Sequence, residues 1–185
     1  LDSGEHIKRT KDLTRILINT YNKKYPDHFI IDSKREKICR AAALHDVGKI
    51  SISDTILNKK GRLTDEEMEI MKTHTTKGYE IIKGFKLNDD EEQERYSLDI
   101  AKYHHERWDG RGYPEGLKGD EIPLWSQIVG IVDVYDALVS PRVYKKAFSH
   151  EKAMEMILAG ECGTFNPILL ECLKDAEELL KNEYK

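Results

Sequence analysis

The sequence has few of the features that mark membrane, secreted or nucleic-acid-coating proteins. It contains three cysteines (Cys39, Cys162 and Cys172) with no CxxC pair, and no apolar run reaches the ~18 residues that a membrane span needs. No signal-peptide pattern opens the chain, and the net charge of −4 argues against a surface that coats nucleic-acid polymers. We therefore expect a cytoplasmic chain, or the cytoplasmic domain of a larger membrane-associated protein, with reduced cysteines packed in its core.

The 185 residues are enough for one domain with a sizeable core. Charged residues make up 35% of the chain, yet the apolar residues cluster in periodic segments, which favours a folded and well solvated helical protein. The chain starts at Leu1 without a methionine. We expect residues 1–185 to form one domain excised from a longer protein that carries a sensor or receiver domain upstream.

Apolar spacing predicts an all-α fold, since no stretch alternates as a strand would. The expected helices cover residues 5–21, 33–48, 64–85, 88–107 and 123–139, and two more begin near Ser149 and Pro167.

Several residues predict where these helices begin and end. Ser33 with Glu36, and Thr64 with Glu67, have the spacing of capping boxes. Gly48 is a natural helix stop, and Gly78 could interrupt the third helix.

Histidine is the residue that stands out. Five of the seven histidines lie in or beside apolar helical segments, namely His6, His45, His74, His104 and His105. A single histidine in such a place is usually a hydrogen-bonded core residue, but five of them beside acidic residues favour a metal site.

Three acidic residues lie in the same apolar context. Asp46 follows His45 directly, and Asp133 sits inside IVGIVDVYDAL, where an unpaired carboxylate would cost several kcal/mol. A cation would compensate Asp133, with an arginine partner as the alternative. The arginine partner, or an internal cap, suits Asp136 better.

Mixed imidazole and carboxylate ligands suit iron, manganese or zinc rather than calcium. Six or seven such ligands are too many for one tetrahedral site and are about right for two ions that share a carboxylate. Two adjacent metal ions are typical of enzymes that hydrolyse phosphate esters.

The stretch HHERWDGRGYPEG joins His104 and His105 to a loop with four glycines between Gly110 and Gly119. Glycine content alone favours a plain surface turn. Beside the two histidines, we expect a loop whose backbone approaches a bulky anionic ligand closely.

Taken together, these segments resemble the HD-GYP family, a branch of the HD metal-dependent phosphohydrolases. The matching blocks are HDVGK from His45, MKTHTTKGYEII around His74, HHERWDGRGYP from His104, GLKGDEIP, IVDVYDAL with Asp133, and SPRVYKKA from Ser140. The resemblance covers nearly the whole chain. It implies a helical bundle of the HD phosphohydrolase type, with its metal site among the central helices.

The resemblance also implies an activity and a metal centre. The activity is hydrolysis of cyclic di-GMP to linear pGpG, with a second step to GMP left open. A hydroxide between two divalent ions, iron or manganese, would attack one phosphorus, and the ribose 3′ oxygen would leave. One ion would be held by His6, His45, Asp46 and Asp133, and the other by His74, His104 and His105, with Asp46 shared.

Further residues receive roles from the same resemblance. Asp46 and Lys49 would be catalytic, with Lys49 on the scissile phosphate. The substrate contacts would come from Lys49, Arg111, Gly112, Tyr113, Pro114, Arg142 and Lys145. The GYP segment would also contact a signalling partner.

The chain departs from the family pattern at four places. Asp2 stands where the family often has a glutamate that recruits a third ion, so two ions are favoured and Asp2 is a candidate third-ion ligand. Thr75 replaces a proline, Gln127 an arginine, and Val143 the proline of RPYK.

Two other functions stay open. The first is hydrolysis of another cyclic dinucleotide or of a nucleotide, because the metal site recognises only phosphate. The second is a nucleotide-sensing or adaptor module with little catalysis.

Overall fold

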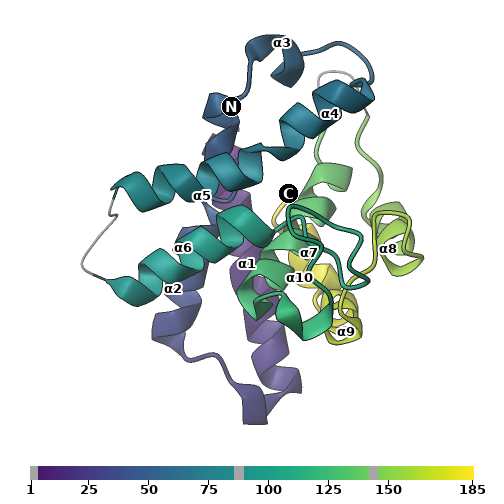
Figure 1. Ribbon diagram of the computed structural model, residues 1–185. Coiled ribbons are helices and arrows are strands. Elements are labelled where there is room, and N and C mark those ends of the chain that lie inside the picture. Colours follow the sequence, from purple (N-terminus) through teal and green to yellow (C-terminus); the bar gives the residue numbers. More distant parts are fainter. Residues whose placement is uncertain (1–3, 86–89, 142–145) are drawn as a thin grey trace.

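Helices supply the regular structure of this chain, as the computed structural model shows for residues 4–85, 90–141 and 146–185 (Figure 1). The predicted all-α class is confirmed. Within these ranges the only β-type pairing is an isolated bridge between Asp109 and Lys118. Three predicted site residues (Asp2, Arg142 and Lys145) lie outside the described residues.

Ten α-helices and three short 3₁₀ helices follow one another in the described part of the chain. They are α1 (Gly4–Lys24), η1 (Pro26–His28), α2 (Asp32–Ala42), η2 (Val47–Ser51), α3 (Asp54–Leu57), α4 (Asp65–Lys72), α5 (His74–Phe85), α6 (Glu91–Tyr103), η3 (Gly119–Glu121), α7 (Leu124–Val139), α8 (His150–Leu158), α9 (Pro167–Asp175) and α10 (Glu177–Asn182).

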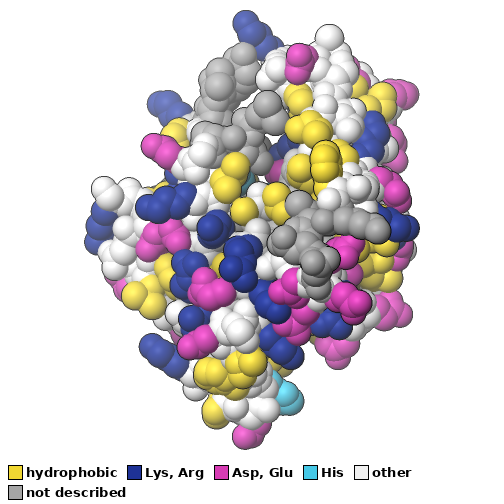
Figure 2. Space-filling model, turned by 90° about the vertical axis from the view of Figure 1, so that its left-hand side faces the viewer, with side chains coloured by type: hydrophobic (Ala, Val, Ile, Leu, Met, Phe, Trp, Pro, Cys, Tyr) yellow, Lys and Arg dark blue, Asp and Glu magenta, His cyan; other side chains and the backbone are white. Residues whose placement is uncertain are grey.

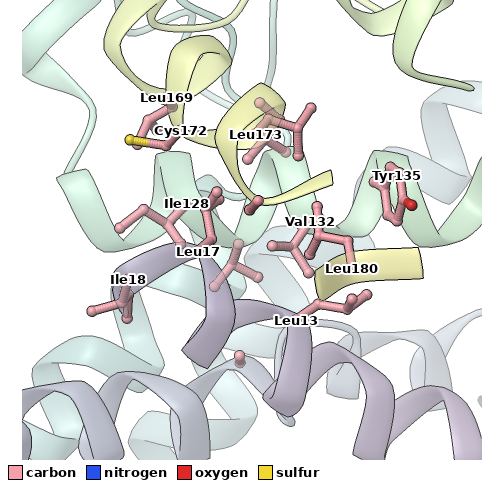
Figure 3. Close-up of a cluster of buried hydrophobic side chains, with 14 of the residues drawn as sticks. Leu13, Leu17, Ile18, Ile128, Val132, Tyr135, Leu169, Cys172, Leu173 and Leu180 are labelled. Carbon is pink, nitrogen blue, oxygen red and sulfur yellow. The ribbon is translucent and has the colours of Figure 1, made fainter. Parts of the chain in front are cut away.

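The hydrophobic core lies where α1, α7, α9 and α10 meet (Figure 3). Leu13 and Leu17 of α1 are completely buried, as are Ile128 of α7 and Leu169 of α9. This spacing of apolar residues produces one buried stripe on each helix. The most apolar segment, α7, is therefore the central helix, as predicted.

Two of the three cysteines belong to this interior. Cys39 of α2 and Cys172 of α9 are fully buried. Burial raises the pKa of the Cys39 thiol to about 12 and that of Cys172 to about 11. Both thiols are thus kept in their unreactive protonated form, which confirms the expected packing role.

The start and end of α2 differ from the prediction. The helix begins at Asp32 with no side-chain cap, because the Glu36 carboxylate accepts from the Arg15 guanidinium instead of closing a capping box on Ser33. It ends at Ala42 rather than Gly48. The His45 Nδ1–H donates to the Ala42 carbonyl oxygen at 2.7 Å, which takes the place of a continuing helical hydrogen bond.

The predicted helix over residues 64–85 is two helices. Its capping box is confirmed, since Thr64 and Glu67 exchange side-chain and backbone hydrogen bonds. The break falls at Thr73 and not at Gly78. The Thr73 hydroxyl donates to the Ile70 carbonyl and the His74 ring to the Met71 carbonyl, so side chains satisfy the last turn of α4.

The charged residues lie mostly on the outside and form pairs of opposite sign. Arg15 pairs with Glu36, and Lys37 with Asp90. On the face seen in Figure 2, basic and acidic side chains are interspersed rather than gathered by sign. Among the described residues, no helix combines the length and apolar character that crossing a membrane requires.

Candidate metal centre

Three of the candidate histidines share one local arrangement at helix ends. In each, Nδ1 lies close to a backbone carbonyl of the turn before it: His45 to Ala42 (2.7 Å), His74 to Met71 (2.7 Å) and His104 to Ile100 (2.8 Å). A carbonyl only accepts, so Nδ1 carries a proton and Nε2 is the nitrogen left to bind a metal. Each ring therefore points a metal-binding nitrogen away from its own helix.

The Nε2 atoms and two carboxylates converge from different helices into two groups of four donors, each within 4.8 Å of one another. The first donor group consists of His6 from α1, His45 and Asp46 from the turn after α2, and Asp133 from α7. The second donor group consists of Asp46, His74 at the start of α5, and His104 and His105 at the end of α6. Asp46 is common to both.

Two glycines allow these helices to approach closely. A Cβ on Gly48 would lie 1.8 Å from the His74 carbonyl oxygen, so only glycine lets η2 pack on α5. A Cβ on Gly130 would lie 2.6 Å from the His104 carbonyl oxygen, where α7 meets the end of α6. These contacts bring Asp46 and Asp133 to the histidines of the second donor group.

Four buried donor atoms without a hydrogen-bond partner show that these residues fit a divalent metal. His45 Nε2, His74 Nε2, His104 Nε2 and Asp46 Oδ1 are all buried without a hydrogen-bond partner. The three nitrogens lie 3.2–3.4 Å from Asp46 oxygens. Donors about 2.1 Å from one ion are separated by about this distance. Buried polar atoms are rarely left unpaired, and a cation could be the partner of these four.

The protonation states support this. Burial raises the pKa of Asp46, but the opposing effect of His45, His104 and His74 is larger and holds it well below its usual range. Burial lowers the pKa of both His104 and His105. Carboxylate and neutral imidazole are the forms that bind metals.

His45 differs from the other histidines. Burial lowers its pKa, but the neighbouring Asp46 and Asp133 carboxylates outweigh burial and raise it well above its usual value. Its Nε2 lies 3.3 Å from Asp133 Oδ1. A proton and a cation therefore compete for this position, and metal binding should release the proton.

Asp136 has a separate role from Asp133, as expected. It is 1% exposed and accepts from the Arg9 Nε–H at 2.9 Å and from His6 Nδ1 at 2.5 Å. Burial raises its pKa, but His6, Arg9 and Tyr184 outweigh burial and hold the pKa below its usual range. The arginine partner predicted as the alternative for Asp133 is thus found at Asp136.

The two donor groups border a cavity of about 560 Å³. Its lining includes five of the seven donors, together with Lys49 and Tyr113. The Lys49 Nζ donates to Asp46 Oδ2 at 2.6 Å, and the Tyr113 ring stacks on the His105 ring at 4.7 Å with 13° between the planes. A set of potential metal donors, a lysine ammonium and an aromatic ring therefore border one cavity.

Only Tyr113 of the predicted GYP contacts reaches that cavity. The Arg111 side chain is 90% exposed. Gly112 packs on its own chain, since a Cβ there would lie 2.4 Å from the His105 carbonyl oxygen. Neither Arg111, Gly112 nor Pro114 is among the lining residues. The close approach that Gly112 permits is to the protein's own backbone, and the expected approach of the loop to a ligand stays a prediction.

The loop is organised by a residue that the sequence interpretation missed. Glu106 is 5% exposed, and its carboxylate accepts the backbone N–H groups of residues 115, 116 and 117 at 2.7–3.2 Å. A glutamate directly after two histidines was the available signal. Arg9 was also missed. It lines the cavity one helical turn after His6, and that spacing was visible in the sequence.

Comparison with known proteins finds relatives over most of this chain. The family model described as HD domain matches residues 5–165. A cyclic di-GMP phosphodiesterase of Vibrio cholerae is 39% identical, over 96% of this chain and 36% of that protein. A 3'3'-cGAMP-specific phosphodiesterase 2 of the same organism is 37% identical, over 93% of this chain and 31% of that protein.

A solved structure supports the fold. The HDG"Y"P protein Bd1817 from Bdellovibrio bacteriovorus superposes with a TM-score of 0.66 at 17% identity, over 97% of this chain and 54% of that one. This likeness concerns the fold alone. The chain spans about a third of the length of the two curated relatives.

Proposed function

The chain belongs to the HD domain family and to its HD-GYP branch, and from this premise we propose that it hydrolyses cyclic di-GMP to linear pGpG. The observation that carries the proposal is the pair of four-donor groups that share Asp46 beside a cavity of about 560 Å³. The cyclic di-GMP phosphodiesterase of Vibrio cholerae supports the choice of substrate.

We propose two divalent ions, iron or manganese. The first donor group would hold one ion and the second the other, with Asp46 between them. Bound ions of this kind activate water and neutralise the charge on a phosphate. Mixed imidazole and carboxylate donors support iron or manganese over calcium. A third ion at Asp2 belongs to the same proposal, on a residue outside the described ones.

Residues of this chain would bind the substrate and orient a metal ligand. The Lys49 ammonium lies beside the shared carboxylate, where it would bind the scissile phosphate and stabilise the negative charge that develops there. The Tyr113 ring borders the cavity and would pack against a ribose or base of the substrate. Asp136 would keep His6 oriented through its hydrogen bond to Nδ1. Arg142 and Lys145, both outside the described residues, would hold the second phosphate or a guanine.

The test is turnover of cyclic di-GMP by protein loaded anaerobically with Fe(II), and separately with Mn(II). Chromatography would resolve pGpG from GMP, and metal analysis would confirm about two ions per chain. The variant Lys49→Met should lower kcat while both ions stay bound. Failure to form linear product with either metal, in protein that holds two ions, would refute the proposal.

A second candidate substrate is 3'3'-cGAMP, favoured by the relative named for that specificity. The metal centre recognises phosphate and cannot separate the two dinucleotides. Competition between them at equal concentration would decide, since the preferred substrate is consumed first in proportion to its kcat/KM.

A nucleotide-sensing or adaptor role is the third candidate, and the complete donor set counts against it. An attached sensor or receiver module, a signalling partner at the GYP segment and a cytoplasmic location complete the proposal. If the adaptor role were the true one, replacing Asp46 would leave the biological output unchanged.

A further inference from the structure

Asp136 connects the first donor group to the last residues of the described chain. Its Oδ2 faces His6 Nδ1, and its Oδ1 accepts from three donors: Arg9 Nε at 2.9 Å, the Ser140 hydroxyl at 3.0 Å and the Tyr184 hydroxyl at 2.6 Å. Tyr184 therefore supplies the shortest of the three hydrogen bonds to that oxygen. Tyr184 lies 48 residues after Asp136 in the chain.

The position of the Asp136 carboxylate decides how the His6 ring is oriented. A carboxylate only accepts, so the His6 Nδ1–H donates and the lone pair remains on Nε2. At His6 the Asp136 carboxylate takes the role that backbone carbonyls take at His45, His74 and His104. The orientation of its ring therefore depends on where the Asp136 carboxylate is held.

Tyr184 is itself held firmly. The Arg9 guanidinium lies 5.3 Å from the centre of its ring, and the His150 ring packs against it at 5.1 Å. The Tyr135 hydroxyl bonds His150 Nδ1 at 2.6 Å, which fixes the His150 ring in turn. The preceding helix α10 is anchored by Leu180, which is 1% exposed and lies in the core beside Leu13 (Figure 3).

We propose that Tyr184 is a positioning residue for the metal ion of the first donor group, acting through Asp136 on His6. The inference rests on the proposed two-ion centre. Docking of α10 and occupancy of the first donor group then stabilise one another, because coupling between two equilibria is reciprocal. Among the described residues, Tyr184 hydrogen-bonds to no donor of the second donor group, which should therefore be independent of it.

The experiment compares Tyr184→Phe with Tyr103→Phe. The first variant keeps the ring, and with it the contacts to Arg9 and His150, and removes only the hydroxyl. The second is a matched control, because the Tyr103 hydroxyl also donates to a carboxylate, that of Glu115 at 3.3 Å, on an exposed part of the molecule.

The readouts are Mn(II) titration by calorimetry and hydrogen exchange of α10, both without substrate. We expect Tyr184→Phe to weaken one of the two ions roughly tenfold, the low end for partners of a ligating histidine, and to leave the other ion unchanged. Mn(II) should slow exchange in α10 of the wild type and the control, and much less in Tyr184→Phe.

The outcomes separate the two proposals. Equal affinity for both ions in Tyr184→Phe and wild type, with equal protection of α10, would overturn the inference and leave the hydrolysis intact. A wild type that binds two ions and forms no linear dinucleotide would overturn the proposed activity. The Mn(II) data on Tyr184 would then still decide the positioning role.

Discussion

The two donor groups share Asp46 but are built in different ways. In the second donor group, His74 and His104 are oriented by backbone carbonyls three or four residues earlier in the chain. In the first, His6 is oriented by Asp136, 130 residues away, and Asp133 projects from the middle of α7. The second donor group forms largely at helix ends, whereas the first depends on how α1 packs on α7.

This difference shows what each group needs in order to form. A histidine just past a helix end finds an acceptor in any correctly folded turn, because the last carbonyls of a helix are unsatisfied. A histidine inside a helix finds its acceptor only after distant helices have docked. The first donor group should therefore be the more sensitive of the two to changes in packing.

The largest effect should come from Asp46→Asn, which breaks both groups at once. Loss of the shared carboxylate removes several kcal/mol of metal-assisted charge stabilisation, so kcat should fall by about a thousandfold or more. Metal analysis should find fewer than two ions per chain. Asp12→Asn, at a surface ion pair with Arg15, is the control. Two tightly bound ions in Asp46→Asn would contradict the shared role.

Next in size is Gly48→Ala, which disturbs the packing between the groups without replacing a donor residue. The new methyl group would collide with the His74 carbonyl, and backbone shifts of this kind cost about 3 kcal/mol. Thermal unfolding should move down by about 6–12 °C. Gly84→Ala on the same helix α5 meets nothing within 4 Å and should unfold at the wild-type temperature or slightly above. Similar melting of both variants would argue against a tight contact between η2 and α5.

Removal of the metal should affect the two donor groups to different extents. An ion at about a hundred times its Kd stabilises the native state by about 2.7 kcal/mol, so chelation should lower the melting temperature by about 5–10 °C. Hydrogen exchange should increase near His6 in α1 more than at the start of α5, since the second donor group retains its local hydrogen bonds. Uniform exchange in both helices would contradict the distinction.

The smallest effect is expected from Glu106→Gln. This variant affects only the second donor group, through the loop whose Tyr113 ring stacks on His105. The amide can accept with one oxygen where the carboxylate used two, so the loop that carries Tyr113 should loosen. A loss of about 1.5 kcal/mol corresponds to roughly a tenfold rise in KM, with kcat changed less. Glu115→Gln, on the exposed part of the same loop, should leave KM unchanged.

Much of the fold was predictable because helix signals are local. The capping box at Thr64, the start of α7 after Pro123 and the buried stripe of α1 follow from residues within one or two turns of each other. The errors had tertiary or competing causes. Glu36 was drawn away from Ser33 by Arg15 of another helix, and the His45 ring ended α2 three residues before its own position.

The sequence by itself determined which donors exist and that they lie in apolar helices, because residue type and periodicity are properties of short segments. Only the tertiary structure decided which carboxylate faces which imidazole, that Glu106 fastens the loop to itself, and that Tyr184 reaches Asp136. Those contacts join residues 9 to 130 positions apart. Their geometry depends on how the helices pack, and a pattern that extends over a few turns carries no record of that packing.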